Sequence, residues 1–296
     1  MMDGKRTLAD LGLVGDGGRN PEVKGLAVDS RQVQPGYLFA ALPGTRVHGG
    51  EFIQYALRMG ASAILTDRAG AALAADVLER SDAALVIADE PRQALAYAAA
   101  LWFGAQPETM VAVTGTSGKT SVATFTRQIW QALGHAACSL GTMGVQGDYE
   151  APLAHTTPEP ITLHRTLAGM ADAHVTHAAM EASSHGLDQH RLDAVRLKAA
   201  DFTNFSQDHL DYHADFTEYF AAKALLFDRV LPEDGTAVVN IDDPRGIEML
   251  DHVRDRGQTL ITVGRAEGAD LRILGQRYDS TGQELRFAWQ WEPHHV

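Results

Sequence analysis

A glycine-rich turn in the middle of the chain has the residue types that hold a phosphate group. It consists of Gly115, Thr116, Ser117, Gly118, Lys119, Thr120 and Ser121. Glycines let successive backbone N–H groups converge on one anion, and a helix that begins there adds partial positive charge. Lys119 supplies a full charge to the outer phosphates, and the Thr120 hydroxyl can ligate magnesium. The pattern predicts an ATP-binding loop, although a plain turn with a surface lysine has the same composition.

The spacing of this loop differs from the common nucleotide-binding loop, in which a glycine stands five residues before the Gly–Lys pair. Val113 occupies that position, so the loop has the shorter form G-x-x-G-K-T. Ordinary kinases and nucleotide switches have the longer loop, and a switch also carries guanine-reading motifs, which we do not find. The spacing therefore argues against both of these classes.

Glu181 is a candidate metal ligand because it follows a predicted strand. The carboxyl ends of parallel strands meet at one edge of a sheet, so this carboxylate is expected near the phosphate loop. Carboxylate oxygens suit magnesium, to which Thr120 already offers a hydroxyl. The residue type alone also allows a plain surface acid.

Lys223 lies in the middle of an apolar helix face that Phe216, Phe220, Phe227 and Val230 form by their 4-3-4-3 spacing. A lysine in such a place commonly extends its long stem to reach water. A lysine kept partly neutral by its surroundings can instead take up carbon dioxide as a carbamate, which is an anion able to ligate a metal. The pattern by itself leaves both interpretations open.

The elements that must position these residues alternate between strands and helices. Residues 110–114 are too apolar for a strand with a wet face and predict a buried parallel strand, followed by the loop and a helix over about 120–133. Residues 174–180 and 237–240 predict further strands. The fold class is therefore α/β, with a doubly wound parallel sheet of the P-loop type.

The first hundred residues predict a separate, smaller α/β domain. Its expected strands are residues 25–31, 37–42, 63–66 and 84–88, and its expected helices are 52–59 and 91–103. Gly104 to Pro107 breaks the pattern. We therefore expect one domain over residues 1–106 and a second over 107–296.

Composition narrows the class of protein. With 296 residues, 45% hydrophobic and 21% charged, the chain is typical of a folded, soluble protein of two domains. Its formal charge of −13 argues against a nucleic-acid partner. It has no apolar run long enough for a membrane span or a signal peptide, and its single cysteine, Cys138, fits a reducing compartment. We expect a cytoplasmic monomer.

The loop, written T-G-T-x-G-K-T-S, resembles that of the Mur ligase family and of the related folylpolyglutamate synthetases. Four further segments resemble the branch that adds the third amino acid to UDP-MurNAc-L-Ala-D-Glu, and they extend over nearly the whole chain: Asp29–Arg31, Thr156–Pro158, Glu181–Arg191 and Thr203–His213. The resemblance implies a small N-terminal UDP-binding domain followed by an ATPase domain.

The resemblance also implies the roles of individual residues. It assigns metal binding to Thr120, Glu181, His209 and Lys223, with Lys223 carbamylated and two magnesium ions expected, and catalysis to Lys119, Lys223 and His209. It assigns binding of the sugar-linked peptide of the substrate to Thr156, Thr157, Ser183, Gln189 and Arg191. It assigns binding of the uridine end of the substrate to Val28, Ser30, Thr45, Arg46 and Val47. Ser183 and the two threonines could instead cap helices or close turns. His185, His190 and His213 lack recognisable zinc spacing, so we interpret them as supporting residues.

The expected activity is ATP-dependent amide-bond formation through an acyl phosphate, which adds meso-diaminopimelate to the D-Glu of UDP-MurNAc-L-Ala-D-Glu. That reaction belongs to peptidoglycan precursor synthesis, and so to cell wall growth, cell shape and cell division. The alternatives are the same ligase adding L-lysine, a non-catalytic nucleotide-binding fragment and, with less support, a folylpolyglutamate synthetase.

The end of the sequence departs from the resembled family. Residues 289–296 predict a strand that breaks off, and the G-x-F-N segment and third domain of the family do not follow. The amino-acid specificity motif lies in that third domain, so diaminopimelate is chosen over lysine only as the commoner substrate. We expect an incomplete second domain, weak nucleotide binding and little ligation by this chain alone.

Overall fold

The computed structural model describes residues 6–44, 46–207, 212–280 and 282–296. The chain divides into two compact units. Unit 1 comprises Met1–Gln106 together with Glu159–Gly169, and unit 2 comprises Pro107–Pro158 and Met170–Val296. The grouping of Glu159–Gly169 with unit 1 was not part of the sequence prediction.

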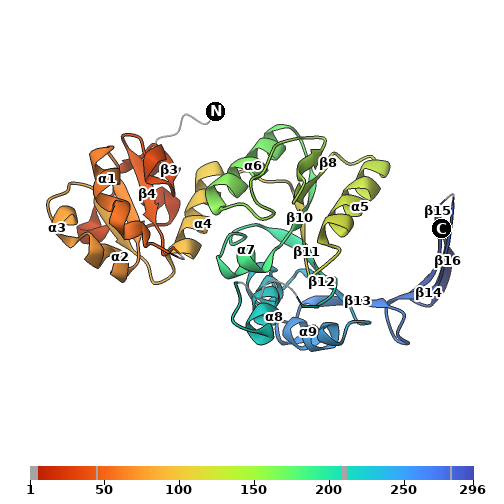
Figure 1. Ribbon diagram of the computed structural model, residues 1–296. Helices are drawn as coiled ribbons and strands as arrows, with labels where there is room; N and C mark the ends of the chain where they lie inside the picture. Colours follow the sequence, from red (N-terminus) through yellow and green to blue (C-terminus); the bar gives the residue numbers. More distant parts are fainter. Residues whose placement is uncertain (1–5, 45, 208–211, 281) are drawn as a thin grey trace. The chain divides into compact units, whose positions relative to one another are not determined.

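Unit 1 is built on a four-stranded parallel sheet in the order β3-β4-β5-β6 (Figure 1). Its strands are β3 (Gly25–Ala27), β4 (Tyr37–Ala41), β5 (Ala63–Thr66) and β6 (Ala84–Ile87), beside a small antiparallel pair, β1 (Arg6–Thr7) and β2 (Glu22–Val23). Its helices are α1 (Ile53–Arg58), α2 (Arg68–Leu73), α3 (Ala75–Leu78) and α4 (Pro91–Phe103), with 3₁₀ turns at Ala9–Leu11, Asp16–Gly18, Ser30–Gln32 and Gly49–Phe52.

The alternation of side chains along the central strands produces two core layers in unit 1. Leu38 and Leu65 pack with Leu95 of α4 on one face of the sheet. Phe39 and Ile64 pack with the α1 side of the unit on the other. Both faces are therefore buried, as a parallel sheet requires.

Unit 2 contains a ten-stranded sheet in the order β16-β15-β14-β13-β12-β11-β7-β10-β8-β9. The seven strands from β14 to β8 run parallel, and antiparallel pairing extends the sheet beyond them, through β15 and β16 at one edge and β9 at the other. The strands are β7 (Thr109–Thr114), β8 (Ala137–Gly141), β9 (Gly144–Gly147), β10 (His177–Glu181), β11 (Leu197–Phe202), β12 (Thr236–Asn240), β13 (Thr259–Gly264), β14 (Leu271–Asp279), β15 (Gly282–Trp289) and β16 (Glu292–His295).

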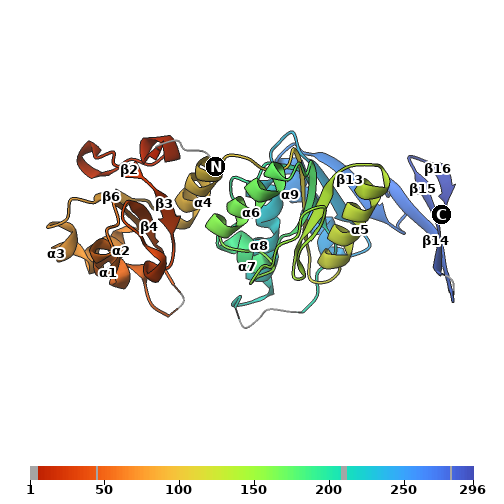
Figure 2. The same ribbon diagram turned by 90° about the horizontal axis from the view of Figure 1, so that it is seen from above.

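The helices of unit 2 cover both faces of its sheet. They are α5 (Lys119–Ala132), α7 (Ser184–Asp188), α8 (Phe216–Leu225) with a π-helical turn at Leu226–Val230, and α9 (Pro244–Asp255), while α6 (Pro160–Asp172) is divided between the two units. Figure 2 shows α5 on one side of the sheet, with α7 and α8 on the other. This layering confirms the predicted doubly wound α/β class.

Three predicted elements differ from the structure. The strand expected from His174 begins only at His177, because His174 has a left-handed φ of 64° after α6. The strand expected over 289–296 is instead a hairpin, since Gln290 and Trp291 both have positive φ and turn the chain between β15 and β16. The strand expected over 25–31 ends at Ala27, where the Asp29 carboxylate accepts a hydrogen bond from the Arg31 amide and starts a 3₁₀ turn.

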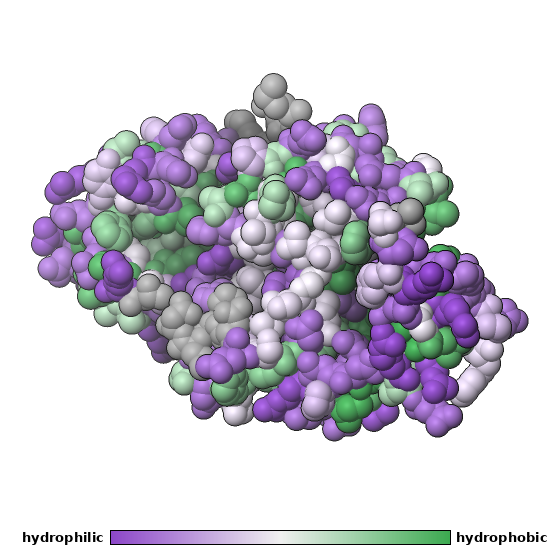
Figure 3. Space-filling model, turned by 45° about the vertical axis from the view of Figure 1, so that its right-hand side comes forward, coloured by the Kyte–Doolittle hydropathy of each residue, from purple (hydrophilic) through white to green (hydrophobic). Residues whose placement is uncertain are grey.

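The surface shows the mixture of hydrophilic and apolar residues that is expected of a folded chain with this composition. On the face drawn in Figure 3, apolar residues gather in small areas among hydrophilic ones. In the described part of the chain no helix is both long and apolar enough to cross a membrane.

Candidate active site

The phosphate loop connects β7 to α5, as the sequence predicted. Gly118 is the residue before α5 and has a left-handed φ of 86°. Gly115 has a φ of 138°, and a Cβ built there would lie 2.0 Å from the Thr203 hydroxyl oxygen. Neither position admits a side chain without strain or collision. The two glycines therefore fix the course of the loop.

A segment after β11 holds this loop in place. Asn204 accepts hydrogen bonds from two loop amides, through its carbonyl from Thr116 at 2.9 Å and through Oδ1 from Ser117 at 2.9 Å. The Ser117 carbonyl accepts from Thr203 Oγ1 at 2.7 Å and from Asn204 Nδ2 at 3.0 Å. Sequence reasoning quoted Thr203 and Asn204 within a motif but gave them no role. A role in holding the loop could have been inferred from their position, because they directly follow β11, a strand that pairs with β7.

Two lysines meet at one carbonyl of the loop. Lys119 Nζ donates to the Gly115 and Thr116 carbonyl oxygens, both at 2.9 Å, and Lys223 Nζ donates to the same Gly115 oxygen at 2.8 Å. Lys223 is only 1% exposed, and its Nζ lies 4.2 Å from the centre of the Tyr219 ring. The sequence allowed two interpretations of Lys223. The first of them, in which the side chain extends to water, is therefore wrong.

The helix that carries Lys223 differs in part from the predicted one. The apolar face does not continue as one α-helix to Val230, because α8 ends at Leu225 and a π-helical turn follows. Phe216 is 38% exposed, whereas Phe220 and Phe227 are buried. The predicted apolar face is therefore buried around Lys223 and open at its first residue.

Glu181 ends β10, which pairs in parallel with β7 so that Glu181 lies beside Val113. Its side chain is 2% exposed. Oε1 accepts hydrogen bonds from Thr120 Oγ1 and from the Thr142 amide, both at 2.9 Å. A carboxylate and a hydroxyl that touch in this way form an oxygen-rich corner, which suits a hard divalent cation.

The remaining predicted metal ligand, His209, lies outside the described residues. Within the described part of the chain, no group of three or more His, Cys, Asp or Glu side chains is arranged to hold a metal ion. The oxygen-rich corner is thus formed by Thr120 and Glu181, with Thr142 as a neighbour that sequence reasoning missed.

The residues predicted to hold the substrate peptide form one hydrogen-bonded network. Thr157 Oγ1 donates to the Glu181 carbonyl at 3.0 Å and accepts from the Ser183 amide at 3.1 Å. Arg191 Nη1 donates to the Thr157 carbonyl at 2.7 Å, and Arg191 Nη2 donates to Gln189 Oε1 at 2.7 Å. The network orients Arg191 before any ligand arrives.

Several of these side chains also have local structural contacts. Ser183 Oγ accepts from the Gly186 amide at 3.1 Å and so caps α7. Thr156 Oγ1 lies 3.0 Å from Thr142 Oγ1. The capping role that the sequence left open for Ser183 is therefore present, and it is compatible with a second role toward a ligand.

A cavity of about 600 Å³ brings most of the predicted residues of unit 2 together. The lining residues that the sequence analysis had named as site residues are Thr116, Gly118, Lys119, Thr120, Thr156, Thr157, Glu181, Ser183, Arg191 and Lys223. Gly115, Ser117, Ser121 and Gln189 are not among the lining residues, whereas Thr142, His155, Ser184 and His185 line it without having been given a site role. Ser184 Oγ is buried and has no hydrogen-bond partner among the described residues.

Unit 1 has its own cavity, of about 850 Å³. Val28, Ser30 and Val47 line it as predicted, together with the aromatic residues Phe39, Phe52 and Tyr55. Arg46 is not among its lining residues, and Thr45 lies outside the described residues. At its edge the Arg31 guanidinium donates to Asp29 at 2.6 Å and holds the pKa of that carboxyl below its usual value.

Comparison with known proteins agrees with this architecture. Residues 22–102 match the catalytic domain of the Mur ligase family, and residues 113–296 match the Mur ligase middle domain. The chain is 48% identical over 248 residues to a UDP-N-acetylmuramoyl-L-alanyl-D-glutamate--2,6-diaminopimelate ligase of Mesorhizobium japonicum, covering 82% of this chain and 49% of that one. It is 44% identical over 284 residues to the protein of that name from Caulobacter vibrioides, covering 94% and 57%.

A solved structure of a ligase with this name superimposes with a TM-score of 0.82 at 25% identity, covering 99% of this chain and 59% of that one. The chain thus spans about half the length of the curated relatives it matches. Since the middle-domain match alone extends over more than half of the residues, the chain belongs to the Mur ligase family.

Proposed function

We propose that this chain carries the ATP site and the nucleotide-sugar site of a ligase that adds diaminopimelate to UDP-MurNAc-L-Ala-D-Glu. The observation that carries the proposal is the meeting of Lys119, Lys223 and the Thr120–Glu181 pair with Arg191 around one cavity. A cation for the phosphates from Lys119, oxygens for metal ions from Thr120, Glu181 and a carbamate on Lys223, and a cation for a carboxylate from Arg191 are the groups that phosphoryl transfer to a carboxylate needs.

The phosphates of ATP would lie against the loop Gly115–Ser121. Lys119 Nζ donates to the carbonyl oxygens of Gly115 and Thr116, so its ammonium lies against the loop. We propose that it turns to the outer phosphates when ATP binds, where its charge opposes that of the transferring group. Thr203 and Asn204 keep the loop in position for this.

Magnesium would be held by Thr120 and Glu181, with His209 proposed as a further ligand. The contact between the Thr120 hydroxyl and the buried Glu181 carboxylate supports this donor set. The ion, when bound, neutralises charge on the phosphates of ATP. The protein's own part is to keep both oxygens close together and shielded from water.

Lys223 is proposed to carry a carbamate that ligates a second magnesium. In that reaction the neutral Nζ attacks the carbon of carbon dioxide, a C–N bond forms, and one proton is released to solvent. The burial of Lys223 favours a neutral amine. Isotopically labelled bicarbonate would give a carbamate NMR signal in the unaltered chain and none in Lys223→Met, while a signal that persists in Lys223→Met would contradict the assignment.

The substrate carboxylate, which is that of the D-glutamyl residue, would be oriented by Arg191 and its hydrogen-bonded partners. Its oxygen attacks the γ-phosphorus of ATP, the bond to ADP breaks, and an acyl phosphate forms. The amine of the incoming amino acid then attacks the activated carbonyl and phosphate leaves. The names of the relatives support diaminopimelate as that amino acid, with L-lysine as the alternative.

We place this reaction in the cytoplasm, in the synthesis of peptidoglycan precursors, and propose that the chain acts as a monomer. The single buried Cys138 supports a reducing compartment. Analytical ultracentrifugation of the purified chain tests the oligomeric state, and a dimer at micromolar concentration would contradict a monomer.

The test of function begins with binding. Isothermal titration of the chain with MgATP and with UDP-MurNAc-L-Ala-D-Glu should show one site for each. ADP release is then measured with diaminopimelate or L-lysine, with and without a polypeptide that supplies the part of the relatives' length beyond this chain. Release that requires diaminopimelate supports the proposal. Binding without any release favours a non-catalytic nucleotide-binding protein, and failure to bind either ligand overturns the proposal.

A further inference from the structure

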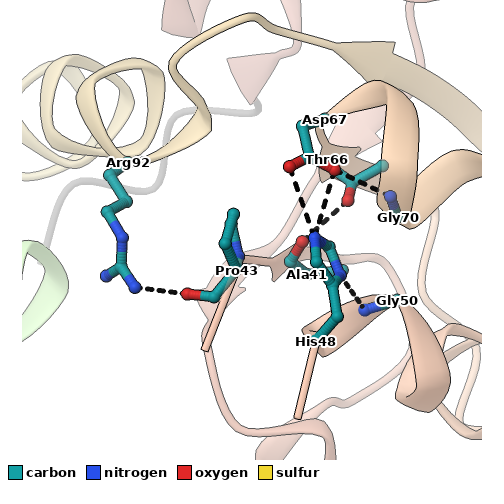
Figure 4. Close-up of polar contacts among 8 residues, drawn as sticks. All are labelled: Ala41, Pro43, His48, Gly50, Thr66, Asp67, Gly70 and Arg92. Carbon is teal, nitrogen blue, oxygen red and sulfur yellow. Dashed lines mark hydrogen bonds and ion pairs between the residues drawn. The ribbon is translucent and has the colours of Figure 1, made fainter. Parts of the chain in front are cut away.

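A short loop of unit 1 borders the apolar cavity and is held at both ends. Pro43, Gly44 and Val47 of this loop line the cavity. At its base the Gly49 amide donates to the Leu42 carbonyl at 2.8 Å. On the α4 side, Arg92 donates from its guanidinium to the Pro43 carbonyl (Figure 4). These contacts fix the two ends of the loop, at Pro43 and at Gly49.

His48, directly after the loop, is bound through both ring nitrogens. Nδ1 accepts a hydrogen bond from the Gly50 amide at 2.9 Å. Nε2 lies 3.1 Å from Asp67 Oδ1 and 3.3 Å from Oδ2. Since Nδ1 is the acceptor, Nε2 carries the proton and donates to Asp67. Figure 4 shows the ring between the Gly50 backbone and the start of α2.

The space that the imidazole ring of His48 occupies depends on a glycine inside helix α2. Gly70 lies within α2, where alanine would ordinarily be more stable by about 1 kcal/mol. A Cβ at Gly70 would lie 2.5 Å from His48 Cε1 and 2.1 Å from Thr66 Oγ1. Thr66 is fully buried and donates to the Ala41 carbonyl at 2.7 Å, so it has no room to move. Gly70 thus leaves the space that the imidazole occupies.

Asp67 joins the ring to α2. Its Oδ1 accepts from the Gly70 amide at 2.7 Å and so caps the helix, while the carboxylate also receives His48 Nε2. An asparagine here would keep the oxygen that caps the helix, but it would lose the negative charge and would place an NH₂ donor where Oδ2 now lies 3.3 Å from the donor Nε2 of His48. The carboxylate is therefore what connects the loop to the sheet and helix behind it.

We propose that His48, Asp67 and Arg92 are positioning residues that hold Pro43, Gly44 and Val47 of this loop against the cavity, so that these three can hold the nucleotide end of the substrate. This rests on the proposed assignment of that cavity to the uridine end. None of the three residues lines the cavity itself. They act by removing conformational freedom that ligand binding would otherwise have to remove.

The first experiment titrates UDP into Asp67→Asn, with ADP titrated into the same sample. The variant keeps the helix cap and weakens the imidazole contact, because the charge is lost and an amide donor faces Nε2, so the Kd for UDP should rise about tenfold. The Kd for ADP should stay unchanged, because its proposed site lies in unit 2. The matched control is Asp10→Asn, since the Asp10 carboxylate accepts from Thr7, has no other hydrogen bond among the residues that the structure describes, and lies outside the cavity.

The second experiment uses Gly70→Ala, which alters none of the polar groups of His48 or Asp67. We expect the added methyl to displace the imidazole and to raise the Kd for UDP, again without a change for ADP. His48→Gln, whose amide can still accept from Gly50 and donate to Asp67, should recover part of the affinity that His48→Ala loses. A merely structural role would not produce this recovery.

The outcomes separate the two proposals. UDP binding that is equally tight in Asp67→Asn, Gly70→Ala and the unaltered chain overturns the positioning role alone. Failure of the unaltered chain to bind UDP overturns the assignment of the cavity, and the positioning role with it. A rise in the Kd for both UDP and ADP would indicate general unfolding and would also contradict the inference.

Discussion

At the scale of single residues, the candidate active site depends on a few lysine and carboxylate side chains that are held by hydrogen bonds. Lys119 and Lys223 share the Gly115 oxygen, and Glu181 accepts from Thr120 and Thr142. Each of these contacts satisfies a group that is buried or half-buried, which would otherwise be costly. The same side chains line the cavity of unit 2.

The first prediction concerns Lys119. In Lys119→Ala the charge opposite the outer phosphates is lost, so the Kd for MgATP should rise by about ten- to a hundredfold. Isothermal titration measures it, with Lys198→Ala as the matched control because Lys198 is an exposed lysine of the same unit. Equal affinities in the two variants would show that Lys119 is an ordinary loop residue.

The second prediction concerns Glu181. Glu181→Gln keeps the shape of the side chain and removes the charge, so addition of magnesium should improve ATP affinity much less than in the unaltered chain. The change in Kd between magnesium and EDTA buffers is the measurement. Glu150→Gln, at an exposed position, should keep the full magnesium effect. If both variants keep it, Glu181 is not a ligand.

At the scale of elements, the parallel pairing of the strands decides which side chains lie together at the carboxyl ends of the strands, beside the loop. β7 lies between β10 and β11, which brings Glu181 to one side of the loop and Thr203 to the other.

The same sheet places one carboxylate in an unfavourable position. Asp201 lies on β11 between Val113 and Val238, half-buried and without a hydrogen bond or ion pair among the described residues.

The third prediction follows from Asp201. Desolvation raises its pKa to about 7, above the value of 3.8 for a solvated aspartate. Between these values the folded state keeps a proton that the unfolded state releases, so stability falls as pH rises. Asp201→Asn should therefore raise the free energy of unfolding at about pH 8 by on the order of a few kcal/mol, and change it little near pH 4.

Urea unfolding at the two pH values measures this effect. Asp234→Asn is the matched control, because Asp234 is an exposed aspartate of the same unit. A stability of Asp201→Asn that falls with rising pH as steeply as in the unaltered chain would contradict the prediction.

At the scale of the whole molecule, the two cavities belong to different compact units. Every residue that lines the unit 1 cavity lies in residues 28–55, and every residue that lines the unit 2 cavity lies in residues 116–223 outside Glu159–Gly169. Each unit also has its own sheet. We therefore expect the two sites to form independently of each other.

The fourth prediction is that a change in one site leaves the other intact. Lys119→Ala should keep the Kd for UDP within about twofold of the unaltered chain, because the two cavities belong to separate compact units and share no lining residue. Asp67→Asn should likewise keep the Kd for ADP. A UDP affinity that falls with that for ATP in Lys119→Ala would show coupling between the units.

Local sequence was enough to predict the loop and its flanking elements. The β7–loop–α5 order follows from an apolar run, two glycines and a helix, all within about 25 residues of chain. It was not enough for the turn at Gln290–Trp291, because neither residue type ordinarily takes positive φ. Nor did the apolar spacing around Lys223 reveal the π-helical turn after Leu225, which alters hydrogen bonding without altering the apolar pattern.

The sequence by itself determined the α/β class, the phosphate loop and, by resemblance, the family. Only the tertiary structure decided which groups touch. Asn204 meets Ser117 across 87 residues and Lys223 meets Gly115 across 108, and His48 finds Asp67 only because Gly70 leaves room for its ring. The physical reason is that a pattern along the chain records which surface each element buries, whereas contacts between elements depend on strand register and on the space that neighbouring side chains leave.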